Sequence, residues 1–291
     1  MVDYMDLSKI TNLRANYSKS KVGYQLDDKK EFSIVRNTLV NLNMPTENFD
    51  LNLSNLVIES DSYTSGTSYN SKKDLITNPE NSYDFIHELF HMASNNAKKE
   101  SIGSIINIKG KRLGDSLNEG ITDLFTYYGD NNYKQKYPIE SFVASVLVDL
   151  YGKEIFINHF NGDSEKLYNS FGEDKNDVLE MILNLDEFTL SNIEFQDSIA
   201  MIGSGFVEKR KYNPDNLSDC FVDSMLLLFR LVSSKDEKLS KKYFDILNSE
   251  FNKDNETINF LKSAFEMSSY ENYDEVLNYI KEEIFEEEMK L

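Results

Sequence analysis

The chain has 291 residues, with 50 acidic and 31 basic side chains, a formal net charge of −19 and a single cysteine. This charge argues against a nucleic-acid backbone or an anionic membrane as the main partner. One cysteine excludes an internal disulfide and fits a reducing compartment. Residues 1–21 are polar and no stretch approaches membrane-spanning length, so we expect a soluble, cytoplasmic protein, unless it is exported without a leader or cut from a larger precursor.

The first predicted elements are a short amphipathic helix and three strands. Phe32, Val35 and Leu39 recur at helical spacing and predict a helix over residues 31–42. Short segments with apolar or alternating residues between polar turns then predict strands at 56–60, 66–70 and 74–77.

The next segment, His87-Glu88-Leu89-Phe90-His91, contains two of the three histidines of the chain. Residues four apart share one face of an α-helix, so both imidazoles can reach a single metal ion. Glu88 lies about a third of a turn away, close enough to take a proton from a metal-bound water. This is the H-E-x-x-H arrangement of zinc-dependent peptidases.

The residues around this motif predict a buried helix. Asn78-Pro79 ends the extended structure, and either Asn81 or Ser82 can cap the helix that follows. Apolar residues then occupy most sides of the helix. Buried imidazoles next to a carboxylate need partners, which favours metal binding over a solvated polar face.

A catalytic zinc needs a third protein ligand. A third histidine six residues after His91 is absent, and Cys220 lies in an apolar helical segment where a lone cysteine is usually a core residue. A hairpin is predicted over residues 103–113. After it, Glu119 and Asp123 are four residues apart on a second helix, where Glu119 can bind the metal and Asp123 can accept the outer N–H of a ligand histidine.

Together the two motifs resemble those of a known family. The run His87-Glu88-Leu89-Phe90-His91 followed by Asn118-Glu119-Gly120-Ile121-Thr122-Asp123 looks like the gluzincin pattern of thermolysin-like metallopeptidases. The similarity covers roughly residues 55–130, and the segment between the motifs is longer than is usual in the family. The resemblance implies that Glu88 is the general base, that Asp123 supports a ligand histidine and that Asn118 supports the site. The zinc ligands that it implies are His87, His91 and Glu119.

Sheet, metal helix, hairpin and second helix occur in the order that a zincin-like fold requires. We therefore expect an α+β protein with a small mixed sheet and the active-site helix in its N-terminal half. The expected domains are a catalytic core over 1–130 and a helical lobe over 131–291. The strand at 66–70 resembles the sheet edge that pairs with a peptide in such folds, although an ordinary edge strand is the alternative.

After Pro138 the apolar spacing becomes helical almost throughout. The predicted helices span residues 139–151, 175–190, 217–233, 238–251 and 273–289.

The predicted chemistry is hydrolysis of a peptide bond, in which Glu88 moves the proton of a zinc-activated water to the leaving amine. The oxyanion needs a further donor. The leading candidates are His159 and Tyr137, and the sequence does not choose between them. His159 also lies near a helix end, where Asn161-Gly162 can simply cap the helix and leave the ring exposed. Further candidates are Tyr127, Tyr128 and Tyr151.

Two hypotheses from different classes remain. The first is an active zinc metallopeptidase that acts on a peptide or protein substrate. The second is a zincin-fold binding or regulatory module in which zinc is structural and nothing is turned over. An intact Glu88 favours the first, and the lack of an identified oxyanion donor favours the second. The substrate, endo- or exopeptidase action and the oligomeric state are not indicated by the sequence.

Overall fold

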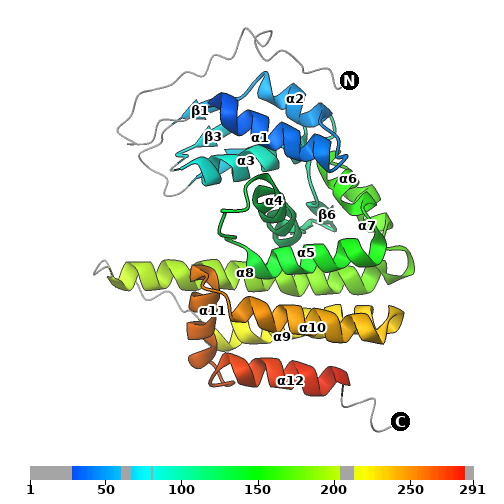
Figure 1. Cartoon of the computed structure of the whole chain (residues 1–291), viewed down its shortest axis with the longest axis vertical. Coiled ribbons are helices and arrows are strands. Elements are labelled where there is room, and N and C mark those ends of the chain that lie inside the picture. Colours follow the sequence, from blue (N-terminus) through cyan, green and yellow to red (C-terminus); the bar gives the residue numbers. More distant parts are fainter. Residues whose placement is uncertain (1–27, 60–66, 80, 204–212, 286–291) are drawn as a thin grey trace. The chain divides into compact units, whose positions relative to one another are not determined.

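The computed structural model describes residues 28–59, 67–79, 81–203 and 213–285. Within these ranges the chain is mostly helical and contains three small sheets (Figure 1). The fold class is therefore mixed α and β, as predicted. None of the described helices combines the length and the apolar character needed to cross a bilayer.

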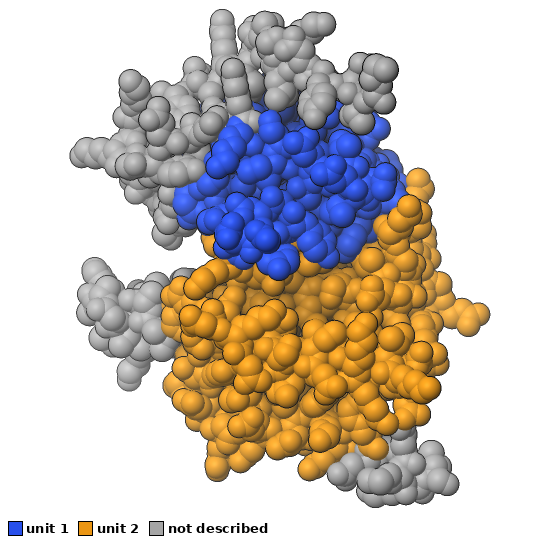
Figure 2. Space-filling view, in the orientation of Figure 1, with its two compact units in different colours: residues 1–103, 125–133, 156–164 blue, residues 104–124, 134–155, 165–291 orange. Residues whose placement is uncertain are grey.

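The chain forms two compact units that are interleaved along the sequence (Figure 2). Helices α4 (Asp115–Gly129) and α6 (Glu154–Phe160) each begin in unit 2 and end in unit 1. The sequence predicted one domain boundary, at residue 130, whereas each compact unit combines several segments of the chain. The predicted boundary stays a prediction. Unit 1 is drawn from residues 1–103, 125–133 and 156–164, and unit 2 from 104–124, 134–155 and 165–291.

Unit 1 contains a three-stranded sheet in the order β1-β3-β2. Strand β1 pairs with β3 in parallel and β2 pairs with β3 antiparallel, so β2 lies at an edge. A second, two-stranded sheet is formed by β4 and β5. The elements are α1 (Asp28–Asn41), α2 (Glu47–Leu53), β1 (Val57–Glu59), β2 (Ser68–Asn70), β3 (Leu75–Thr77), α3 (Ser82–Ser94), β4 (Asn95–Asn96) and β5 (Ser101–Ile102).

The core of unit 1 surrounds helix α3. Phe32 from α1 packs against Phe85 of α3, with ring centroids 5.9 Å apart. Phe90 of α3 contacts Phe125 of α4 at 5.9 Å, and Phe125 contacts Phe160 of α6 at 4.6 Å. These aromatic contacts bury large apolar areas on several sides of α3 and fix the helix that carries the two histidines.

Unit 2 is built mainly around helix α9. Helix α8 packs against α9, and α10, α11 and α12 also contact it. The elements are β6 (Ile106–Ile108), β7 (Lys111–Leu113), α5 (Pro138–Tyr151), α7 (Ser164–Asn169), the 3₁₀ helix η2 (Gly172–Asp174), α8 (Lys175–Gly203), α9 (Pro214–Lys235), α10 (Glu237–Phe251), α11 (Glu256–Glu266) and α12 (Tyr273–Phe285).

Most of the predicted elements are present. The strands over 57–59, 68–70 and 75–77, the helix with the two histidines, the hairpin and the second helix are confirmed. Residues 60 and 66 of the predicted strands and residues 286–289 of the last predicted helix lie outside the described residues. The predicted end of one helix at residue 190 is wrong. Helix α8 continues to Gly203 because residues 191–202 contain neither glycine nor proline to stop it.

Four short helices of 6 to 11 residues have no predicted range: α2, α6, α7 and α11. For α6 the sequence indicated only its end, near Asn161-Gly162. Short helices have little propensity of their own and depend on tertiary packing, which a sequence pattern does not display. One of them, α2, contributes a residue that holds α3 in place.

Candidate metal centre

Helix α3 begins at a local cap and is buried along most of its length. The side chain of Asn81 accepts hydrogen bonds from the backbone N–H groups of Tyr83 and Asp84, which makes it the N-cap. Every residue from Asp84 to Ser94 is buried. The predicted burial of this helix is confirmed, and its two histidines are removed from water with it.

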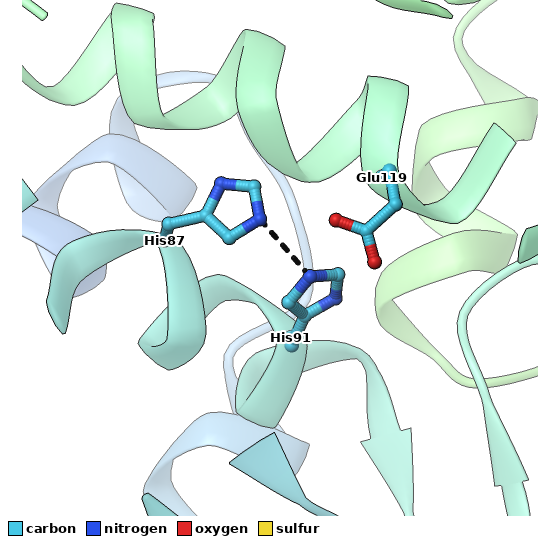
Figure 3. Close-up of side chains that lie close together, drawn as sticks. All are labelled: His87, His91 and Glu119. Atoms are coloured by element: carbon cyan, nitrogen blue, oxygen red, sulfur yellow. Dashed lines mark hydrogen bonds between the residues drawn. The ribbon is translucent and has the colours of Figure 1, made fainter. Parts of the chain in front are cut away.

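His87 and His91 lie one turn apart on α3 with their rings close together (Figure 3). Their Nε2 atoms are 3.1 Å apart, and the residues are only 4% and 8% exposed. Two neutral imidazoles can make this contact only if one of the Nε2 atoms carries the proton. A metal ion between them would instead use a lone pair from each ring.

Glu119 on α4 presents its carboxylate to the same two rings (Figure 3). One ligand atom from each of His87, His91 and Glu119 lies within 4.8 Å of the other two. Two imidazole nitrogens and a carboxylate oxygen form a donor set that could hold a metal ion. The three side chains predicted as ligands thus lie together in the described part of the chain.

Two further predicted residues flank these ligands in the sequence. Glu88 follows His87 on α3 and is 8% exposed, and Asn118 precedes Glu119 on α4 and is 4% exposed. The sequence therefore places an acid–base group directly beside a candidate ligand.

The C-terminal end of α3 is fixed by hydrogen bonds inside unit 1. The side chain of Asn52 on α2 donates to the carbonyl oxygens of Met92 and Asn95 at 2.9 and 2.7 Å. Asn95 in turn donates to the hydroxyl oxygen of Tyr69 on β2 at 2.8 Å. Burial, together with the neighbouring Asp74, raises the pKa of Tyr69, which keeps the hydroxyl protonated as a donor to Asp74.

The N-terminal end of α4 is fixed inside unit 2 by a distant carboxylate. Asp186 on α8 accepts hydrogen bonds from the backbone N–H groups of Gly114 and Ser116, at 2.7 and 2.8 Å, and from the Ser116 hydroxyl. It therefore caps the helix that carries Glu119. Gly114 is required here because its φ is +91° and a Cβ would lie 2.4 Å from the carbonyl oxygen of Ser104.

Asp123 joins α4 to the first turn of α5. The residue is fully buried, and its carboxylate accepts from the backbone N–H groups of Lys136 and Tyr137, at 3.0 and 3.2 Å, and from the hydroxyl of Ser141 at 3.1 Å. Tyr137 is thus joined to Asp123 through its main chain. The predicted support of a ligand histidine by Asp123 stays a prediction.

Helix α5 approaches α4 closely at the residue after Glu119. A Cβ on Gly120 would lie 2.3 Å from the carbonyl oxygen of Glu140, so only glycine fits. Glu140 is 2% exposed, and burial raises its pKa to about 7, against the effect of a hydrogen bond from Thr189. The negative charges of Asp123 and Glu119 add to this increase.

His159 lies near the end of α6 in unit 1 and is completely buried. The alternative that its ring is exposed is therefore wrong, although Gly162 does end the helix with a φ of +58°. Neither ring nitrogen has a hydrogen-bond partner among the residues that the structure describes. Burial lowers the pKa of His159 to about 3, with a further contribution from His91, so the ring is neutral at physiological pH.

The other tyrosines considered as oxyanion donors are exposed or already hydrogen-bonded, and Cys220 lies outside the ligand cluster. Tyr127 and Tyr128 are 41% and 48% exposed. The hydroxyl of Tyr151 donates to Asp174 at 2.8 Å, which occupies its proton. Cys220 is half-buried on α9 and does not belong to the ligand cluster identified in the described residues. Its half-buried side chain is less enclosed than the core position expected from the sequence.

Two supporting residues were missed in the sequence. Asn52 lies 40 residues before Met92, and Asp186 lies 72 residues after Gly114. Asp186 follows an apolar run in a predicted helix, where an isolated acidic residue gives no sign of what it caps. Asn52 lies in a short helix that no periodicity revealed.

No family model matches this chain, and no curated protein or solved structure does so either.

Proposed function

We propose that this protein is a zinc-dependent peptidase of the gluzincin type with a zincin-like fold. The observation that carries the proposal is the pair of buried histidines on α3, with Nε2 atoms 3.1 Å apart and the Glu119 carboxylate within reach of the same ion. A purely structural polar cluster would not need Glu88 beside these ligands. The single cysteine and the absence of a membrane-spanning helix among the described elements suit our proposal of a cytoplasmic enzyme.

Zinc suits this donor set better than magnesium or calcium, which prefer oxygen ligands. With Zn–N distances of about 2.0–2.1 Å and tetrahedral angles, the two ligand nitrogens should be about 3.4 Å apart. The observed 3.1 Å needs only a small adjustment. A bound zinc would polarise the scissile carbonyl and lower the pKa of its water towards neutrality.

Within this proposal Glu88 is the general base. It takes a proton from the attacking water and delivers it to the leaving nitrogen, so that the amine departs without negative charge. The developing oxyanion then needs a hydrogen-bond donor besides the metal. The neutral ring of His159 keeps one N–H that can fill this role, and the Tyr137 hydroxyl is the other candidate.

The substrate class that we propose is an extended peptide or an extended segment of a protein. Strand β2 lies at an edge of its sheet, and the outer residues Ser68 and Asn70 are exposed. Such an edge offers unpaired main-chain groups, with which an extended chain can pair irrespective of its sequence. Tyr69 connects this strand to the end of α3 through Asn95.

Zinc analysis together with one substitution tests the proposal. Purified protein reconstituted with zinc should hold about one ion per chain by mass spectrometry. Glu88→Gln should keep that ion and lose about 10²- to 10⁴-fold in turnover of a fluorogenic peptide library. Glu237→Gln, which alters an exposed carboxylate paired with Lys241 on α10, is the matched control and should behave like the wild type.

Two results would contradict the proposal. If no zinc is retained after reconstitution, the ligand assignment is wrong. If Glu88→Gln turns over peptides as fast as the wild type, then Glu88 is not the base. Stoichiometric zinc without chelator-sensitive cleavage of any peptide would instead establish the alternative, a binding module with structural zinc.

A further inference from the structure

Unit 2 contains a pocket of about 350 Å³ that is lined by three helices. Its buried floor is formed by Glu140 of α5 with Thr189 and Asn192 of α8, which are 2%, 7% and 6% exposed. Thr189 and Asn192 are three residues apart and share one face of their helix. The first turn of α11 closes the remaining side.

In this floor two acceptors share one proton and a third acceptor has no donor among the described residues. The Thr189 hydroxyl lies 2.7 Å from Oε1 of Glu140 and 2.8 Å from the carbonyl oxygen of Leu185, and it has one proton to share between them. The Oδ1 atom of Asn192 is buried and has no partner among the described residues. A buried acceptor without a donor costs free energy, so a ligand rich in N–H groups would stabilise this floor.

Charge favours a cationic ligand over an anionic one. Glu140 is the ionisable group of the floor; burial raises its pKa to about 7, and the charged groups that act on it, Asp123 and Glu119, are both negative. The other charged residues that line the pocket, Lys136 and Glu256, are exposed and of opposite sign. A cation placed beside Glu140 would therefore gain a charge-assisted hydrogen bond in a poorly hydrated setting.

The walls of the pocket suit a long apolar stem. Tyr137, Ile193 and Phe260 supply apolar surface to its lining. Methylene groups can pack against such side chains while the charged end reaches the floor, and a planar guanidinium can also stack on an aromatic ring. An ammonium group would not use the second of these features.

We propose that this pocket binds an alkylguanidinium group, such as the side chain of arginine, with the guanidinium donating to Glu140 and to Oδ1 of Asn192. The fork of N–H groups in a guanidinium matches a carboxylate and can reach a second acceptor at the same time. Binding here does not depend on zinc or on peptide hydrolysis.

Calorimetric titration of chelator-treated wild-type protein with N-acetyl-arginine amide tests the proposal. N-acetyl-citrulline amide has nearly the same shape without the charge, and it should bind at least about 10-fold more weakly. Chelator leaves the proposed peptidase inactive, so this measurement can succeed or fail independently of peptide cleavage. Equal affinity for the two compounds, or no binding of the arginine compound at millimolar concentration, would overturn the proposal.

Two variants locate the binding. Glu140→Gln and Asn192→Leu should each weaken binding of the arginine compound, Glu140→Gln by about 10-fold or more, while Glu237→Gln on α10 should not. Circular dichroism checks that each variant is folded, and the wild-type comparison of arginine with citrulline needs no variant at all. If both variants fold and bind like the wild type, the guanidinium is held elsewhere and the pocket assignment is wrong.

Two additional ligands show whether the bound guanidinium belongs to an arginine within a peptide or to a small metabolite. Free L-arginine carries a charged α-ammonium and carboxylate, whereas the blocked compound mimics an arginine within a peptide. Tighter binding of the blocked compound indicates a peptide ligand, and tighter binding of the free amino acid indicates a small metabolite. N-acetyl-lysine amide should bind more weakly than either, and lysine binding as tightly as arginine would contradict the guanidinium assignment.

Discussion

Helices α3 and α4 carry the candidate ligands, and they are held in place in different ways. Helix α3 begins at a cap one residue before it, Asn81, and it is buried almost throughout. The first turn of α4 is capped by Asp186, which is 72 residues from Gly114 in the sequence. Its later part is held through Asp123 by the first turn of α5.

The difference shows that the candidate ligands depend on different parts of the sequence. His87 and His91 owe their positions to apolar burial around their own helix. Glu119 depends on a polar network that is assembled only when unit 2 has folded. Substitutions far from α4 in the sequence should therefore displace the Glu119 carboxylate. Substitutions near the start of α3 should change the positions of His87 and His91 little.

The largest effect is expected from Asp186→Ala. It removes the acceptor for two backbone N–H groups and one hydroxyl at the start of α4, which should cost about 4 kcal/mol in the free energy of unfolding. Because Glu119 is one turn away, zinc affinity should fall about 10- to 100-fold. Urea unfolding and competition with a zinc-binding dye measure the two quantities.

The matched control is Asp236→Ala, which removes the exposed N-cap of α10. It should cost about 1 kcal/mol and leave zinc affinity unchanged. If Asp186→Ala is as mild as this control, then the distant carboxylate does not hold α4.

The next largest effect is expected in the pH dependence of stability, from the buried Glu140 of unit 2. The pKa of Glu140 is raised from 4.5 to about 7 in the folded state, so the folded protein binds the proton more tightly than the unfolded chain. Its contribution to stability is complete below pH 4.5 and is lost as the pH rises to 7, by about 3 kcal/mol. Urea unfolding from pH 5 to 8 should show this loss in the wild type, and Glu140→Gln should abolish it. A difference between wild type and variant that does not change with pH would contradict the raised pKa.

The buried base of unit 1 should act in the opposite direction. The pKa of His159 is lowered from 6.5 to about 3, so protonation favours the unfolded chain. Stability should fall as the pH drops below 6.5, by about 3 kcal/mol at pH 4. His159→Leu should remove this part of the acid sensitivity, as measured by the unfolding midpoint of chelator-treated protein between pH 7 and 4. If acid sensitivity is unchanged, the imidazole is not buried as the structure places it.

The contrast between α3 and α4 also explains how much could be predicted from the sequence. His87, Glu88 and His91 are recognisable because their spacing lies within one helix turn and the chain has few histidines. The cap at Asn81 is equally local. The order of sheet, helix and hairpin follows from patterns shorter than about fifteen residues.

The sequence could not reveal interactions between distant residues. Asn52 and Asp186 are ordinary polar residues whose role depends on tertiary packing. His159 is another example. Gly162 correctly indicated that a helix ends nearby, but nothing in the local sequence indicated the aromatic side chains that bury the His159 ring. Local patterns indicate where a helix stops, whereas the burial of a side chain depends on the rest of the fold.

The smallest effect, and the sharpest test of the contrast, is expected from Asn81→Ala. Its side chain accepts from Tyr83 and Asp84 at 2.9 and 3.0 Å, so its loss should cost about 1 kcal/mol in urea unfolding. Zinc affinity should change by less than about 3-fold, because packing around Phe85 and the bonds from Asn52 keep α3 in position. A loss of zinc affinity as large as that caused by Asp186→Ala would mean that α3 depends on its cap as strongly as α4 does. The two helices would then be equally sensitive, and local burial would not be what positions the histidines.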